Sequence, residues 1–289
     1  MELMVIALVI GSAALHPFRD LLIKGQSFPE SAYLGVTGSW VIFAAVQAAL
    51  FDQTLTLPTE VWPLVAGSAL GLFIYYLCVM LTLKAGDLSV YYPIIRSSPL
   101  AIVAIGYLFL ERYYSPLTLM GIGLTLVGAI MIQYRRGAGL LQHPKLILTA
   151  TGAMIGSAIY GLADSAAMES IAPAPFLFWV YTALTLVFTV FFTLTRPSKR
   201  SLNLQLFGCW CSTPLQVIAS GALSYASYVL ILFAFQAGGE VAAVSATRQA
   251  SIPLSVLLGA LVLKEDRLLA RLAWSILLAG GVVLVMVEG

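Results

Sequence analysis

Charged side chains are scarce in this sequence. Asp, Glu, Lys and Arg make up only 10% of its 289 residues, whereas 60% of the residues are hydrophobic. A soluble domain usually carries about 25% charged residues, so this composition argues against a soluble protein and predicts a polytopic membrane protein. The formal net charge is only +2 and the basic residues form no continuous arm, which argues against nucleic acid as a partner.

Cysteines are few, and familiar chemical motifs are missing. The three cysteines, Cys78, Cys209 and Cys211, lack the spacing of a zinc site or of a disulfide framework. We interpret them as packing residues or as thiols outside any disulfide. The sequence contains no Walker loop, no dinucleotide fingerprint and no metal-ligand cluster. These absences argue against an ATP-driven pump, and we expect neither a cofactor nor enzymatic activity.

Long apolar runs dominate the sequence instead. A run of about 20 apolar residues can cross the roughly 30 Å hydrocarbon layer of a bilayer as a helix, and the connections between the runs are short. The sequence therefore predicts an all-α membrane protein with ten transmembrane helices. Their expected ranges are residues 3–23, 31–51, 61–83, 88–110, 117–134, 147–168, 175–195, 213–236, 240–263 and 269–287. Glycines in the fifth and tenth helices predict close helix packing, at Gly121, Gly123, Gly128, Gly280 and Gly281.

The ten predicted helices form two similar sets of five. Residues 10–13 (Ile-Gly-Ser-Ala) recur at residues 155–158, and Arg96 aligns with Arg248 at an offset of 152 (248 − 96). An odd number of helices in each set gives the two sets opposite orientations, as in the inverted repeats of many secondary transporters. We expect one repeat in residues 1–138 and the other in residues 146–289, with a substrate site between them near the midplane.

Arg96 and Arg248 are the strongest candidates for that site. Each lies about nine residues into its predicted helix, or roughly 13 Å from the helix start, close to the bilayer centre. An arginine in a membrane is costly unless it faces protein or water, and a guanidinium grips carboxylate, phosphonate or phosphate with two parallel bonds. The alternative is structural, with each arginine satisfying carbonyl groups of a broken helix or pairing with a buried acid. Pro93, Pro99 and Pro253 predict kinks around the two arginines.

Other polar side chains extend the predicted substrate site. The repeat pairs Tyr76 with Tyr228 at the same offset of 152 (228 − 76), which favours these two over the other tyrosines. A tyrosine can line a cavity with both an apolar face and a hydroxyl, although aromatic residues at helical spacing more often pack in a core or face lipid. The full expected set of substrate-binding residues is Arg96, Arg248, Tyr76, Tyr228, Tyr92, Ser98, Ser251 and Tyr160.

Three further residues are candidates for ion coupling. His16 and Asp20 lie four residues apart and share a helix face, and a histidine beside a carboxylate can carry protons near neutral pH. Asp164 is an acid inside the sixth predicted helix, where it can pair with an arginine or bind a proton. For His16 and Asp20 the alternative is an interfacial role, in which Asp20 pairs with Arg19 at the membrane surface.

The distribution of lysine and arginine predicts the orientation. The connections after the odd-numbered helices contain eleven basic residues, whereas those after the even-numbered helices contain Arg112 alone. The positive-inside rule then puts the basic connections in the cytoplasm and both termini outside. The alternative is a miscounted helix near the N-terminus.

The segments around the two arginines resemble the EamA family of the drug/metabolite transporter superfamily. The most specific are residues 86–96 (GDLSVYYPIIR) and 244–251 (VSATRQAS), within two EamA-type halves that cover nearly the whole chain. The resemblance implies a secondary transporter, often an exporter of amino acids or other metabolites. It also implies a cavity lined by the first, third, fourth, sixth, eighth and ninth helices, and for many members cytoplasmic termini. Arg19 and Asp20 depart from the Trp and Asn usual in a subgroup, and Gln249 stands where a Glu often follows the arginine.

These observations predict a secondary active transporter that works by alternating access, with export as the favoured direction. We expect its substrate to be a small anionic or zwitterionic metabolite such as an amino acid or a phosphonate, with a proton as the possible coupling ion. We expect a multi-pass monomer or homodimer in the lipid bilayer of a cell membrane, such as the bacterial inner membrane. The alternatives are a multidrug exporter of lipophilic cations and a non-transporting membrane protein such as a lipid scramblase.

Overall fold

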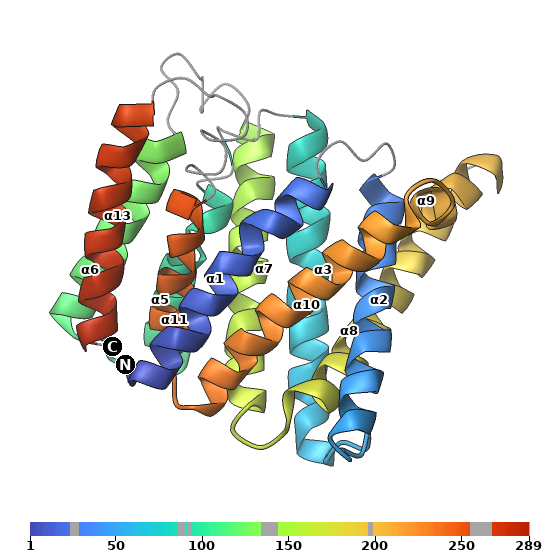
Figure 1. Cartoon of the computed structure of the whole chain (residues 1–289), viewed down its shortest axis with the longest axis horizontal. Helices are drawn as coiled ribbons and strands as arrows, with labels where there is room; N and C mark the ends of the chain where they lie inside the picture. Colours follow the sequence, from blue (N-terminus) through green and yellow to red (C-terminus); the bar gives the residue numbers. More distant parts are fainter. Residues whose placement is uncertain are drawn as a thin grey trace.

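The fold is a bundle of helices, seen in a computed structural model of the chain (Figure 1). The structure describes residues 1–23, 29–85, 91, 94–133, 144–195, 199–254 and 268–288, and these residues contain no β-strand. The helices are α1 (Leu3–Ile23), α2 (Pro29–Leu50), α3 (Trp62–Ala85), α5 (Ser98–Phe109), α6 (Pro116–Gln133), α7 (Pro144–Ala167), α8 (Pro173–Leu194), α9 (Lys199–Ser212), α10 (Pro214–Gln236), α11 (Val241–Thr247) and α13 (Leu268–Glu288). Two 3-10 turns, η1 (Thr59–Val61) and η3 (Arg248–Ala250), precede α3 and follow α11.

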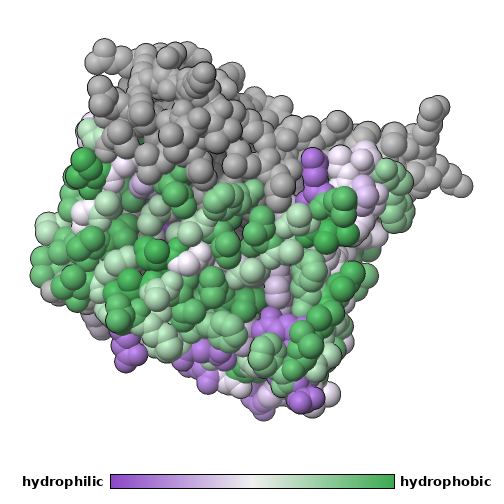
Figure 2. Space-filling view, in the orientation of Figure 1, coloured by the Kyte–Doolittle hydropathy of each residue, from purple (hydrophilic) through white to green (hydrophobic). Residues whose placement is uncertain are grey.

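Eight of the ten predicted ranges each coincide with one helix, to within three residues at both ends. Proline occupies the first position of α2, α6, α7, α8 and α10. A backbone N–H at this position has no partner within the helix, so proline loses nothing by lacking one, and its fixed φ suits the first turn. Five stretches are long and apolar enough to cross a membrane: Glu30–Leu50, Thr59–Thr82, Pro144–Ala167, Pro173–Leu194 and Pro214–Gln236. Shorter apolar helices accompany them, and large hydrophobic side chains are exposed over much of the face seen in Figure 2.

The two predicted helices that carry the arginines are interrupted beside them. Residues 94–96 are helical, a turn follows at Ser97, and α5 begins at Ser98 with Pro99 in its first turn. In the second half, α11 ends at Thr247 and η3 begins at Arg248. The predicted kinks therefore occur within residues 94–99 and 247–250, whereas Pro93 and residues 255–267 lie outside the described part of the chain.

Helix α9 was not predicted, because it lies in the polar connection between the predicted helices at 175–195 and 213–236. The side chains of this stretch are too polar to predict a buried helix from composition, and packing against α2 accounts for it. The Ser31 hydroxyl of α2 accepts a hydrogen bond from the Cys209 backbone N–H (2.9 Å) and donates one to the Leu206 carbonyl (3.4 Å). Cys209 is buried in this contact, whereas Cys211 is exposed. The helix lies beside the start of α2, at the end of the bundle away from the termini (Figure 1).

The most extensive helix contacts join the first half of the chain to the second. Helix α3 packs along α7, α1 along α10, α2 along α8 and α6 along α13, while α5 contacts both α7 and α11. Figure 1 shows the α6–α13 pair at one side of the bundle and the α2–α8 pair at the other. In each of these pairs one helix precedes residue 134 and the other follows residue 143.

Glycines allow the closest crossings, as expected for membrane helices that pack through small residues. Where α3 crosses α7, a Cβ on Gly71 would lie 2.6 Å from the Tyr160 backbone nitrogen and 2.8 Å from the Gly156 carbonyl oxygen. Among the glycines predicted to pack closely, Gly121, Gly128 and Gly281 do so between α6 and α13. Gly123 and Gly280 face open space, so that part of the prediction is wrong: they point away from the crossing that their neighbours make.

Candidate transport site

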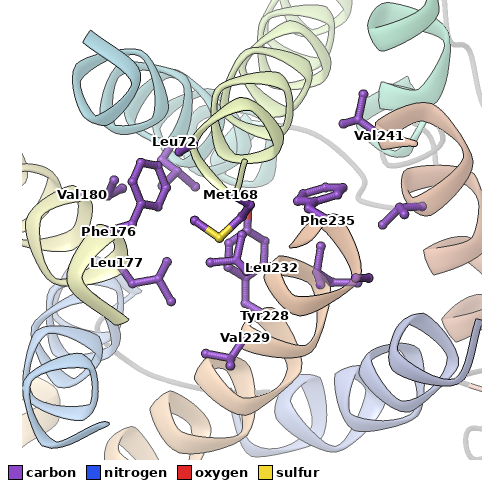
Figure 3. Close-up of a cluster of buried hydrophobic side chains, with 14 of the residues drawn as sticks. Leu72, Met168, Phe176, Leu177, Val180, Tyr228, Val229, Leu232, Phe235 and Val241 are labelled. Atoms are coloured by element: carbon purple, nitrogen blue, oxygen red, sulfur yellow. The ribbon is translucent and has the colours of Figure 1, made fainter. Parts of the chain in front are cut away.

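A cavity lies between α5, α7, α10, α11 and η3. Its volume is about 20 Å³, room for about one water molecule and far below the roughly 300–1,000 Å³ typical of small-molecule sites. Its apolar wall includes Phe235 and Val241, which Figure 3 shows beside the buried core that also contains Tyr228. The polar side chains that line it are Ser157, Tyr160, Tyr228, Ser245 and Arg248. A mixed lining of this kind would suit a small polar metabolite once the cavity has widened.

Arg248 brings a positive charge to the cavity wall. It opens η3, where α11 has just ended, so the interruption of the helix puts its side chain beside the cavity. The guanidinium carbon lies 5.6 Å from the centre of the Tyr228 ring, within the range of a cation–π contact. The aromatic face stabilises the positive charge and leaves N–H donors of the guanidinium unused. These donors can bind an anion in the cavity.

A buried carboxyl group lies behind Tyr228. The Tyr228 hydroxyl donates a hydrogen bond to Asp164 Oδ2, and Asp164 is only 1% exposed. Its other oxygen, Oδ1, makes no hydrogen bond to any described residue, and neither does the neighbouring Ser68 hydroxyl on α3. Arg248 is near enough to interact electrostatically with this carboxyl group. Arg248, Tyr228 and Asp164 thus form one continuous chain from the cavity into the protein.

The two interrupted helices meet next to the cavity. The Gln249 side-chain amide donates a hydrogen bond to the Arg96 carbonyl oxygen (3.1 Å), and the Ser98 and Ser245 hydroxyls lie 3.4 Å apart. A broken helix in a membrane leaves carbonyl groups that must be satisfied by protein or by water in a cavity. Gln249 meets this need at Arg96, which explains why a neutral amide is useful at that position.

Comparison with known proteins shows a resemblance to one family. A sequence model of the EamA-like transporter family matches residues 1–134. Nearly half of the chain is therefore similar to a family of multi-pass membrane transporters in the drug/metabolite transporter superfamily, whose members are not enzymes.

Solved structures share the fold of the chain. One crystal structure of a protein superposes on this chain with a TM-score of 0.78, at 16% sequence identity, and the match covers 98% of this chain and 97% of the other. At such low identity the likeness shows a shared fold alone. No curated protein matches the chain.

Three of the predicted substrate-binding residues line the cavity, namely Arg248, Tyr228 and Tyr160. Ser98 lies next to it through its contact with Ser245. Arg96 is partly buried and does not belong to the cavity wall. Its backbone carbonyl ties it to the other interrupted helix through the Gln249 amide.

The remaining predicted residues lie away from the cavity or outside the described part of the chain. Tyr76 packs against the rings of Tyr33 (5.3 Å) and Tyr75 (5.2 Å) and interacts with Tyr181, but it does not line the cavity. Ser251 is buried at 2% exposure. Tyr92 lies outside the described residues, and His16 and Asp20 belong to α1, but the structure does not describe their side chains.

Sequence reasoning overlooked several residues of the site. Ser157 stands in the repeated Ile-Gly-Ser-Ala segment, and Ser245 stands three residues before Arg248, so both carried a usable signal. Trp40 of α2 carried none, because an aromatic residue within an apolar run is read as core or lipid-facing. Its ring stacks on Tyr181 (4.1 Å) and tilts against Tyr228 (5.6 Å), and its indole N–H donates to the Ser224 hydroxyl (3.0 Å). Trp40 thereby holds Tyr228 in position. Among the described residues, no group of His, Cys, Asp and Glu could hold a metal ion.

Proposed function

We propose that this EamA-type protein is a secondary active transporter of a small anionic or zwitterionic metabolite, such as an amino acid or a phosphonate. The observation that carries the proposal is Arg248 in the cavity wall, supported by the ring of Tyr228. The guanidinium would bind the carboxylate or phosphonate group with two parallel hydrogen bonds. The hydroxyls of Ser157 and Tyr160, which are 3.3 Å apart, would bind the rest of a polar ligand.

The charge around the cavity favours an anion over a lipophilic cation. Arg248 lines the cavity, whereas the carboxyl group of Asp164 is screened behind Tyr228 and is not part of the lining. A ligand therefore meets the positive group first, and a wall of one sign attracts ligands of the opposite sign. This arrangement disfavours the multidrug-exporter alternative.

Alternating access between two inverted repeats is supported by the pattern of helix contacts. The helices of the two halves correspond in order: α1 to α7, α2 to α8, α3 to α10, α5 to α11 and α6 to α13. If each helix is exchanged with its counterpart, the α1–α10 pair becomes the α7–α3 pair. The α2–α8, α6–α13 and α5–α11 pairs each become themselves. A two-fold relation of this kind is expected for ten membrane helices in two oppositely oriented repeats, residues 1–138 and 146–289. Rocking of the repeats would open the cavity to each side in turn, with export as the proposed direction.

Asp164 is the candidate for holding a coupling proton. A buried carboxylate oxygen without a hydrogen-bond partner is unfavourable, and a proton on Oδ1 could be shared with the nearby Ser68 hydroxyl. Arg248 interacts with this carboxyl group and would also bind the substrate. A proton on Asp164 would therefore change the affinity for the substrate, and bound substrate would change the affinity for the proton. His16 and Asp20 of α1 are the further candidates. We further propose a cell membrane, such as the bacterial inner membrane, with both termini outside.

A ligand screen with matched variants tests the proposal. The full chain, purified in detergent, would be melted in the presence of amino acids, phosphonates and organic cations. An anionic ligand at 100 times its Kd should stabilise the fold by about 2.7 kcal/mol. Arg248→Ala should abolish this effect, and Arg248→Lys should retain a weak one because it keeps the charge but loses the bidentate fork. Lys145→Ala, an exposed position at the start of α7, is the control and should behave like the wild type.

Two results would contradict the proposal. One is an anion effect of undiminished size in a folded Arg248→Ala variant, which would make Arg248 structural. The other is stabilisation by lipophilic cations alone, which would favour the multidrug-exporter alternative. Uptake into liposomes containing the purified protein then separates transport from simple binding.

A further inference from the structure

A second cavity opens on the outer surface of the bundle, between α5 and α6. Its volume is about 250 Å³, and its lining comes from Val103, Ala104 and Tyr107 of α5, Tyr113 and Tyr114 of the following connection, and Leu119 of α6. Apart from the tyrosine hydroxyls and backbone, the lining is apolar. It shares no residue with the cavity at Arg248, so it is a separate groove.

The surface around this groove is of the kind that lipid covers in a membrane protein. Leu108 is 68% exposed, Phe109 76% and Met120 52%, and an exposed apolar patch of this extent would be unfavourable in water. The groove lies where α5 ends at Phe109 and α6 begins at Pro116. That is the end of two membrane helices, the depth at which tyrosines gather at the boundary between acyl chains and head groups.

The rim of the groove has an aromatic edge and a positive charge. The rings of Tyr107 and Tyr113 meet edge to face with centroids 6.1 Å apart. Arg112 stands between Tyr113 and Glu111 in the chain and interacts electrostatically with Tyr114. Its described ion-pair contact, to Glu240, is long at 3.9 Å, and 35% of its side chain is exposed. Most of its donors can therefore reach a second anion beside the groove.

The rim is also held in place by the backbone. The N–H groups of Leu110 and Arg112 both donate to the Gly106 carbonyl oxygen, at 3.1 and 3.0 Å, so the connection folds back onto the last turn of α5. The Tyr114 ring closes over Gly106, where an added Cβ would meet its hydroxyl. Hydrogen bonds and the Tyr114 ring thus hold the backbone at Arg112 against the end of α5, beside the groove.

We propose that this groove binds one phospholipid of the surrounding bilayer, with an acyl chain against Val103, Ala104 and Leu119 and its phosphate at Arg112. The groove opens towards the hydrocarbon layer, which supplies acyl chains but no other apolar ligand at comparable concentration. Guanidinium and phosphate are complementary in charge and in hydrogen-bond geometry. The tyrosines at the rim suit the ester level between the two parts of the lipid. The site is independent of the substrate bound at Arg248.

The test uses the full chain in phosphatidylglycerol–phosphatidylethanolamine vesicles that contain a phospholipid with a photoreactive acyl chain. After illumination, labelled peptides are mapped by mass spectrometry. We expect labelling to concentrate in residues 103–119. Ala104→Trp, which fills the groove, should reduce labelling there, whereas Ile276→Trp, at a position that is 74% exposed on α13, should leave it unchanged. Arg112→Gln should weaken retention of the phospholipid about tenfold, the effect of losing one hydrogen bond to a charged group.

A photoreactive diacylglycerol, which has the acyl chains but no phosphate, provides the second arm. It should label residues 103–119 weakly, and equally in the wild type and Arg112→Gln. Uniform labelling of all exposed helices, or equal labelling by phospholipid and diacylglycerol in the wild type, would overturn the proposal. So would a dimer in detergent that Ala104→Trp dissociates, because a second copy of the chain would then occupy the groove.

Discussion

Replacing Gly71 with alanine tests whether the α3–α7 crossing is as close as the structure describes. The new methyl group would lie 2.6 and 2.8 Å from two backbone atoms of α7, and backbone cannot move aside as a flexible side chain can. The helices would have to separate along their whole contact, and overpacking of this kind costs about 1–3 kcal/mol. Alanine also favours helix over glycine by about 1 kcal/mol, so the expected net loss of stability is about 0–2 kcal/mol, and the loss relative to a glycine-to-alanine change without a clash is about 1–3 kcal/mol.

Gly123→Ala of α6 is the matched control, because the same methyl group would meet nothing within 4 Å. It gains the helix propensity without the clash and should be as stable as the wild type or slightly more stable. Thermal unfolding in detergent, followed by circular dichroism, compares the three proteins. Gly71→Ala should also weaken ligand binding, since α7 carries Tyr160 and Asp164. If Gly71→Ala melts at or above the temperature of Gly123→Ala, the close crossing is wrong.

Three further predictions follow from the site, the α5–α6 connection and the orientation. Tyr228→Phe removes the described donor to Asp164 Oδ2 and should destabilise the fold by about 1–3 kcal/mol, measured by thermal unfolding; an unchanged melting temperature would contradict the bond. Burial, then the Glu240 carboxylate, raises the pKa of Tyr114 from 10.0 to about 12, partly offset by Arg112. The stability that the neutral Tyr114 phenol contributes should therefore be complete below pH 10 and be lost as the pH rises through 12. Thermal unfolding measured across this pH range should show the loss in the wild type and not in Tyr114→Phe. A reporter fused after Gly289 should report the outside of the cell, and a cytoplasmic signal would refute the proposed orientation.

Much of the fold was predictable because apolar length alone defines a helix in a membrane. The runs that became α1, α2, α3, α6, α7, α8, α10 and α13 needed no tertiary information. The interruptions beside Arg96 and Arg248 were also predictable. Pro99 follows the first and Pro253 follows the second, and a proline has no backbone N–H to donate to the preceding turn of a helix. Helix α9 was not, because its polar residues resemble a connection and its contact partner, α2, lies about 170 residues earlier in the chain.

The candidate site was predictable in part, and the reason is the internal duplication. It singled out Arg248 and Tyr228, both of which line the cavity, but it singled out Arg96 and Tyr76 equally, and these do not. Symmetry in a sequence pairs positions, whereas a single conformation of the protein need not present both members of a pair to one cavity. Trp40 was out of reach, because its role depends on which rings of α8 and α10 pack around it.

The pairing of helices across the two halves has a consequence for biosynthesis. Helix α1 packs on α10, and α3 packs on α7, so within the described residues the extensive partners of these two helices both come from the second half of the chain. At about 5–20 residues per second, α1 would wait on the order of ten seconds or more for α10 to be translated. During this time its packing face would be covered only by lipid or by an insertion factor. We expect the nascent first half to be the stage at which this chain is most sensitive to proteolysis and to loss of membrane chaperones.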